Sequence, residues 1–117
     1  MVELVLKIMP KAKGFTLMVQ ALASIMFKTK FERGCIDCQY YAERENPRSV
    51  RYVEQWETLE DVELHIRAQQ FGMLLSLMET AEEMPTLEIH TASEILGLDY
   101  IRAARLGGSG VSVDNSE

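Results

Sequence analysis

The order of hydrophobic periods along the chain limits its fold more than any other feature. In four segments apolar and polar residues alternate, which is typical of strands, and in two regions the apolar residues recur with the period of one helix face. The strands are predicted at 2–9, 35–43, 50–56 and 86–91, and the helical regions at 15–30 and 59–81. The sequence therefore predicts the element order β-α-β-β-α-β.

Individual residues agree with these boundaries. Pro10 ends the first strand, because proline cannot donate to a sheet ladder. Asn46-Pro47 is typical of a turn between the second and third strands, which therefore form a hairpin. Thr58 is a predicted N-cap of the second helical region, with Asp61 three residues later. Together these signals predict an α+β, ferredoxin-like fold, with an antiparallel four-stranded sheet and the helices on one face.

The C-terminal part extends this unit. Ser93 is a predicted N-cap for a short last helix that begins at Glu94. Beyond residue 106 small and polar residues replace the apolar pattern, which is typical of a segment without a core. We therefore predict one domain over 1–106, with a C-terminal helical extension at about 93–106, and a flexible tail at 107–117.

Size and charge restrict the classes of function. A chain of 117 residues matches one domain with one core. Its net charge is −6, so it is a poor candidate for binding nucleic acid or an anionic membrane surface, which requires clustered Lys and Arg. No apolar run approaches the roughly 20 residues of a transmembrane helix, and no signal peptide is recognisable. We predict a cytoplasmic protein with no nucleic-acid or membrane partner.

The two cysteines have the C-x-x-C spacing of redox and zinc sites. Cys35 and Cys38 fall on the second predicted strand, where residues three apart point to opposite faces. No second Cys/His pair with zinc spacing exists in the sequence. We interpret both as structural thiols and predict no metal site.

Both faces of the first strand contain apolar residues. Leu4, Leu6 and Ile8 lie on one face, and Val5 and Met9 lie on the other. Helices on one side of the sheet can cover only one of these faces, and an exposed apolar patch marks an interface. We therefore predict a homodimer that packs sheet to sheet.

Three short motifs stand in a fixed order on the predicted elements. Glu32-Arg33-Gly34-Cys35 joins the first helix to the second strand, and Glu54-Gln55-Trp56 ends the third strand. His65 follows Trp56 by nine residues in the second helical region, and Phe71 comes after it. In this order and spacing, residues 2–91 resemble the antibiotic-biosynthesis-monooxygenase-like (ABM) family of dimeric α/β barrels.

The resemblance implies a homodimer and a choice of activities. Some members are cofactor-free monooxygenases that oxidise quinols or aromatic polyketides with O₂, one branch degrades haem, and many have no known activity. The haem-degrading branch is disfavoured, because Leu75 stands where that branch has its iron-ligating histidine and His65 stands where it has a tryptophan. We therefore expect no cofactor.

His65 is the candidate catalytic residue. In cofactor-free oxygenation a phenol or quinol is deprotonated, and its anion passes an electron to O₂, so the protein supplies a cavity and a proton acceptor. Histidine has a reference pKa near neutrality. His65 lies one turn after Val62 at the edge of the apolar stripe, where it could reach between helix and sheet. The alternative is a histidine that is hydrogen-bonded within this layer.

The candidate substrate-binding residues are aromatic or acidic. Trp56, Tyr52 and Glu54 share one face of the third strand, Tyr40 lies on the neighbouring strand, and Phe71 lies beyond His65. Trp56 could form a wall of an aromatic site, or it could be a core residue. Burial of Glu54 without a partner would be costly, so pairing with a basic residue is the alternative to catalysis.

We predict a cofactor-independent monooxygenase that oxidises a small aromatic or quinol-like substrate with O₂. One alternative is a non-enzymatic homodimer that binds a small hydrophobic ligand or serves as an interaction module. Another is a different reaction on the same fold, such as isomerisation or decarboxylation, which would need no O₂. The sequence does not identify the substrate.

Overall fold

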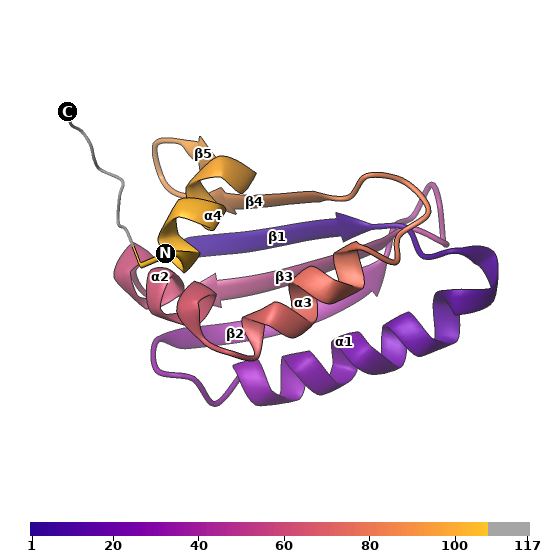
Figure 1. Ribbon diagram of the computed structural model, residues 1–117, viewed down its shortest axis with the longest axis horizontal. Helices are drawn as coiled ribbons and strands as arrows, with labels where there is room; N and C mark the ends of the chain where they lie inside the picture. The colour runs from indigo at the N-terminus through magenta and orange to yellow at the C-terminus, as the bar shows by residue number, and fades with distance from the viewer. Residues whose placement is uncertain (108–117) are drawn as a thin grey trace.

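The computed structural model describes residues 1–107 and has the ferredoxin-like α+β fold. One antiparallel sheet has the strand order β2-β3-β1-β4-β5, and the helices lie against one of its faces (Figure 1). The strands are β1 (Val2–Ile8), β2 (Cys35–Ala42), β3 (Val50–Trp56), β4 (Thr86–His90) and β5 (Ile95–Leu96). The helices are α1 (Phe15–Thr29), α2 (Leu59–Arg67), α3 (Phe71–Met78) and α4 (Leu98–Arg105), and a 3₁₀ turn, η1 (Ala12–Gly14), precedes α1. The predicted element order and antiparallel pairing are confirmed.

The core lies between the helices and the central strands. Alternate residues of β1 and β3 point into it, which is the two-residue period seen in the sequence. From α1 the stripe Met18, Leu22 and Ile25 is buried against the sheet, as its spacing predicts. The buried residues of β1, β3 and β4 in this core are Val2, Leu4, Leu6, Ile8, Val50, Tyr52, Trp56, Leu87 and Ile89.

The second helical region is divided into two short helices. The hydroxyl oxygen of Thr58 accepts the backbone N–H of Asp61 at 3.1 Å, so the predicted N-cap of α2 is confirmed. The chain becomes extended at Ala68, and α3 starts three residues later at Phe71. None of the helices within residues 1–107 has the length and apolarity that crossing a membrane requires.

The C-terminal extension differs from the prediction. The helix begins at Leu98 rather than Glu94, and a short fifth strand precedes it. Thr91, rather than Ser93, organises the turn, because its hydroxyl accepts the backbone N–H of both Ser93 and Glu94. The turn directs Ile95–Leu96 back along β4, whose backbone groups were available for pairing. The predicted tail at 107–117 lies outside the described residues, apart from Gly107.

The prediction that the two cysteines point to opposite faces is wrong. The register of β2 against β3 shifts between Cys35 and Asp37, which is a β-bulge. As a result Cys35 stands opposite Trp56 and Cys38 stands opposite Glu54, both on the inner face. The extra residue of a bulge changes the alternation by one position, and sequence periodicity alone does not reveal it.

The outer face of the sheet is mixed rather than apolar. Val5 and Val53 face each other across β1 and β3, and the same face includes the exposed Tyr41 of β2, opposite Arg51, and the exposed Ile95 of β5, opposite His90. Met9 lies beyond the end of β1. Charged and polar side chains surround the two valines on the same face, namely Glu3, Lys7, Arg51, Gln55, Glu88 and His90. The apolar surface from which the sequence predicts a dimer is therefore interrupted by charged and polar side chains.

Candidate functional site

Three neighbouring inward side chains of β3 form a buried hydrogen-bonded group. The carboxylate of Glu54 accepts the hydroxyl of Tyr52 at 2.6 Å and the indole N–H of Trp56 at 3.0 Å. All three residues are 0% exposed. The alternation of β3 places positions 52, 54 and 56 on one face, so the sequence predicts this grouping. A carboxylate this deep is stable only with partners, and Tyr52 and Trp56 supply two of them.

His65 supplies the third partner of Glu54. It lies on α2, one turn after Val62, and its Nε2 is 3.1 Å from the Glu54 carboxylate. Its Nδ1 is 2.8 Å from Oε1 of Glu32. His65 is 2% exposed, so its imidazole lies between helix and sheet, as its place on the apolar stripe suggests. The ring is therefore held between two carboxylates.

Two aromatic rings enclose the imidazole of His65. The Trp56 ring lies with its centroid 4.6 Å away at an interplanar angle of 36°, and the Phe71 ring is edge-on at 5.3 Å. The negative charges of both carboxylates favour a charged imidazolium. The Trp56 ring favours it too, because an aromatic face attracts a cation. The structure thus brings together His65, Trp56, Tyr52, Glu54 and Phe71, all of which the sequence selects as candidates.

Tyr40 is the candidate that remains apart from this network. It stands opposite Tyr52 in the register of β2 and β3, and it is half-buried against the core. No hydrogen bond of its hydroxyl occurs among the described residues. Tyr40 therefore shares the face of the site but not its hydrogen bonds.

Glu32 is the site residue that sequence reasoning missed. It lies in the turn between α1 and β2, and the amide of Gln70 donates a hydrogen bond to its carboxylate. Gly34 in the same turn has a φ of +86°, and a Cβ there would come within 2.3 Å of the Asp61 side chain. The sequence contains a signal for Glu32, an acidic residue two positions before a required glycine, but it does not indicate that Glu32 contacts His65.

The pKa of His65 is raised to about 9. Burial alone lowers the pKa of an imidazole, but the charge of Glu54 and the hydrogen bonds to Glu32 and Glu54 outweigh it. At neutral pH His65 is therefore an imidazolium. The Glu32 side chain is 24% exposed whereas Glu54 is fully buried, so Nδ1 is the nitrogen closer to solvent.

The two thiols and the phenol near this group stay neutral. Burial, together with the charge of Glu54, raises the pKa of Cys35 to about 11 and that of Cys38 to about 12. Burial and Glu54 also raise the pKa of Tyr52. Because the thiolate is the reactive form of cysteine, neither cysteine is an activated nucleophile. Within residues 1–107, no three His, Cys, Asp or Glu side chains are arranged to ligate one metal ion.

The stability of the fold should depend on pH through His65. Because its folded pKa of about 9 exceeds the reference value of 6.5, the stabilisation is complete below about pH 6.5 and is lost as the pH rises through 9. The difference corresponds to about 3 kcal/mol. We expect the free energy of unfolding, measured with urea, to fall by about 2 kcal/mol between pH 6 and pH 8.5, a range that ends before the raised pKa values of Cys35 and Cys38 add a pH dependence of their own.

His90 offers a matched control for this measurement. It pairs with Glu88 at 2.8 Å on the outer face, where both side chains are partly exposed. The variant His90→Gln should keep the pH dependence, and His65→Gln should lose most of it. Equal pH dependence in the wild-type protein and His65→Gln would contradict the charged state of His65.

Comparison with known proteins assigns the family. The model of the family described as antibiotic biosynthesis monooxygenase matches residues 1–73, which is more than half of the chain. No curated protein matches the sequence. Solved structures that resemble the chain include a conserved protein from Methanosarcina mazei Go1, which is 27% identical with a TM-score of 0.70 and is aligned over 76% of this chain and 89% of its own.

Two more distant structures share the fold. A protein named antibiotic biosynthesis monooxygenase is 14% identical, has a TM-score of 0.69, and is aligned over 80% of this chain and 100% of its own. A protein from Shewanella oneidensis is 21% identical, has a TM-score of 0.69, and is aligned over 82% of this chain and 92% of its own. The predicted family resemblance is confirmed, and the chain belongs to the antibiotic biosynthesis monooxygenase family.

Proposed function

We propose that this protein is a homodimeric, cofactor-independent monooxygenase that oxidises a small aromatic or quinol-like substrate with O₂. Membership of the family supports the reaction class. The observation that supports the proposal is the orientation of His65. Its Nε2 contacts the buried carboxylate of Glu54, and its Nδ1 contacts the partly exposed carboxylate of Glu32. A proton acceptor oriented in this way is what deprotonation of a phenol requires.

The hydroxyl of a bound phenol would take the place of Glu32 at Nδ1. Loss of the Glu32 contact removes one of the interactions that raise the pKa of His65, and this favours the neutral imidazole that accepts the proton. Glu54 then stabilises the imidazolium that forms, in the manner of an orienting carboxylate. The phenolate passes an electron to O₂. The substrate radical and superoxide combine to a peroxide, which takes back the proton from His65 and then loses water to leave a carbonyl. The substrate thus supplies all four electrons and both hydrogens of the water, so no external reductant is needed.

Oxygen uptake tests this proposal. Metal-free protein would be assayed with a panel of naphthoquinols and anthrones over pH 6 to 9.5, against autoxidation without protein at each pH. We expect wild-type uptake above autoxidation, and a loss of about 10²–10⁴-fold in the protein-dependent rate in His65→Gln. Because only neutral His65 accepts a proton, kcat/KM should rise with pH up to about 9.

His90→Gln, which removes the partly exposed histidine, should retain the activity and its pH profile. Protein-dependent turnover that persists in His65→Gln would remove His65 from the mechanism. Uptake no faster than autoxidation across the whole panel would contradict the oxygenase.

The closed state of the His65 group favours a second candidate. Both ring nitrogens are already paired and the residue is almost fully buried, as in a structural ion pair. A homodimer that binds a small hydrophobic ligand without turnover is therefore the alternative. Binding of a quinol without protein-dependent oxygen uptake would support it.

The proposed homodimer rests on the family resemblance and on Val5 and Val53 of the outer sheet face. Sedimentation equilibrium at micromolar concentration measures it directly. A monomer under these conditions would contradict the dimer.

A further inference from the structure

A cavity of about 330 Å³ lies between α3, α4 and the segment that leads into β4. Its volume is at the lower end of the range that holds small organic ligands. All of its lining residues follow residue 73, so they lie beyond the part of the chain that the family model matches. Its apolar lining is made by Leu75, Met78, Met84, Pro85, Leu98 and Ile101.

Charged groups occupy the edge of this cavity. Arg102 and Arg105 come from α4 and Glu79 follows α3, so the charge around the cavity is positive although the whole chain carries −6. None of the three forms a salt bridge within the described residues. The apolar lining with a positive edge suits a molecule that has an apolar body and one negative charge.

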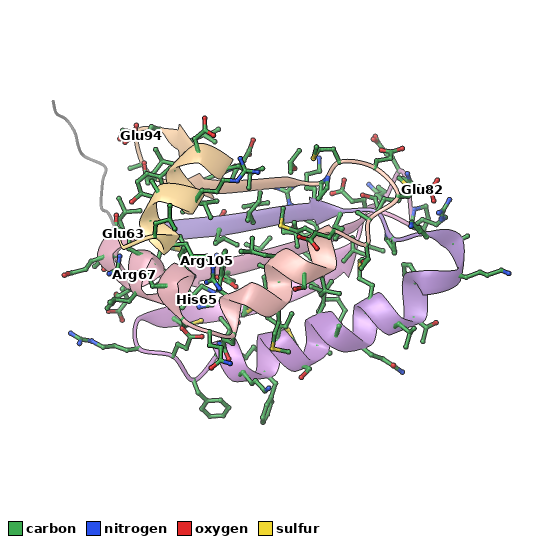
Figure 2. The ribbon with its side chains drawn as sticks, viewed as in Figure 1. Glu63, His65, Arg67, Glu82, Glu94 and Arg105 are labelled. Atoms are coloured by element: carbon green, nitrogen blue, oxygen red, sulfur yellow. The ribbon has the colours of Figure 1, made fainter. Side chains whose placement is uncertain are left out.

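Arg102 and Arg105 differ in their contacts. Arg105 donates to the carbonyl oxygens of Ile66 at 2.6 Å and Ala68 at 3.1 Å, which satisfies backbone acceptors at the end of α2. Its guanidinium also lies 5.7 Å from the centroid of Phe71, and Figure 2 shows Arg105 and His65 at the same end of the molecule. Arg105 therefore joins α4 to the end of α2. Arg102 is exposed, so the N–H groups of its guanidinium are accessible to a ligand.

We propose that this cavity binds a small aromatic carboxylate, with the ring between α3 and α4 and the carboxylate on Arg102. Guanidinium and carboxylate groups match in a bidentate geometry, which an ammonium group cannot offer. Met78 and Met84 give a lining that adapts to the shape of a ring. The site is separate from His65, which is not among the residues that line the cavity. It goes beyond the proposed oxygenase, and binding requires no turnover.

Binding of two matched probes under nitrogen tests the proposal. The full chain, labelled with ¹⁵N, would be titrated with 2-naphthoate and with the neutral 2-naphthalenemethanol. We expect 2-naphthoate to bind about tenfold more tightly and to shift the amide signals of Leu75, Leu98 and Ile101. Arg102→Gln should weaken binding of 2-naphthoate about tenfold and leave binding of the alcohol unchanged.

Arg44→Gln is the matched control, since Arg44 is an exposed arginine between β2 and β3 and does not line the cavity. It should change neither affinity. Leu98→Trp, which fills the cavity, should weaken both probes. Equal affinity of the two probes, unchanged 2-naphthoate affinity in Arg102→Gln, or shifts confined to the surroundings of His65 would each overturn the proposal. No oxygen is present, so the result is independent of whether the protein is an oxygenase.

Discussion

Glu54→Ala is expected to lower the free energy of unfolding by about 3–5 kcal/mol, because it leaves buried donors without an acceptor and removes one of the two carboxylates that pair with the buried imidazolium. The substitution removes the acceptor of Tyr52, Trp56 and His65 together, and all of these donors are buried. The charge of Glu54 is also the first of the interactions that raise the pKa of His65, so this pKa should fall in the variant. Urea unfolding and an NMR titration of the imidazole measure the two effects.

The chain contains its own control for this experiment. Glu88 pairs with His90 at 2.8 Å, but on the outer face of β4, where both side chains are partly exposed. Solvent screens such a pair, and Glu88→Ala should change the stability by less than about 1 kcal/mol. Similar losses in Glu54→Ala and Glu88→Ala would mean that burial of the Glu54 group has little energetic consequence.

Phe71→Ala is expected to lower the free energy of unfolding by about 3–5 kcal/mol, the usual cost of removing a buried phenylalanine ring. Phe71 is 1% exposed, and its ring packs against both the imidazole of His65 and the guanidinium of Arg105. Its loss leaves a cavity and removes the contact between the His65 group and α4. Chemical unfolding monitored by far-UV circular dichroism measures the loss.

Two variants show whether the effect comes from the buried ring. Phe71→Leu retains most of the apolar volume and should cost less than about 2 kcal/mol. Phe27 is 65% exposed, and Phe27→Ala should stay within about 0.5 kcal/mol of the wild-type protein. If Phe71→Ala is as mild as Phe27→Ala, Phe71 has no structural role, and its ring would be free to serve a ligand instead.

Much of the site could be predicted from local patterns. The two-residue period of β3 places Tyr52, Glu54 and Trp56 on one face, and the helical period of α2 places His65 beside the buried Val62. The argument that a buried Glu54 needs a basic partner also agrees with the contact between Glu54 and His65. In a regular strand or helix, local periodicity decides which face a side chain occupies, so the inward direction of these side chains follows from their spacing.

The charged state of His65 could not be predicted in this way. It depends on Glu32, which comes from a turn distant in sequence, and on Glu54, which comes from a strand. A pKa depends on distances between such groups and on their burial, and the sequence contains neither. The sequence suggested a base near neutrality, whereas the structure holds the pKa of the ring at about 9.

By itself the sequence determined the element order, the antiparallel sheet and the inward face of β3, because these follow from hydrophobic periods and turn residues. Only the tertiary structure decided the bulge at Cys35, the strand β5, and the cavity beside Arg102. Each of these depends on pairing or packing between distant segments. At the bulge, a shift of one residue reverses the faces of a strand. At β5, the turn at Thr91 brings Ile95–Leu96 beside β4, whose unpaired edge can form hydrogen bonds with it.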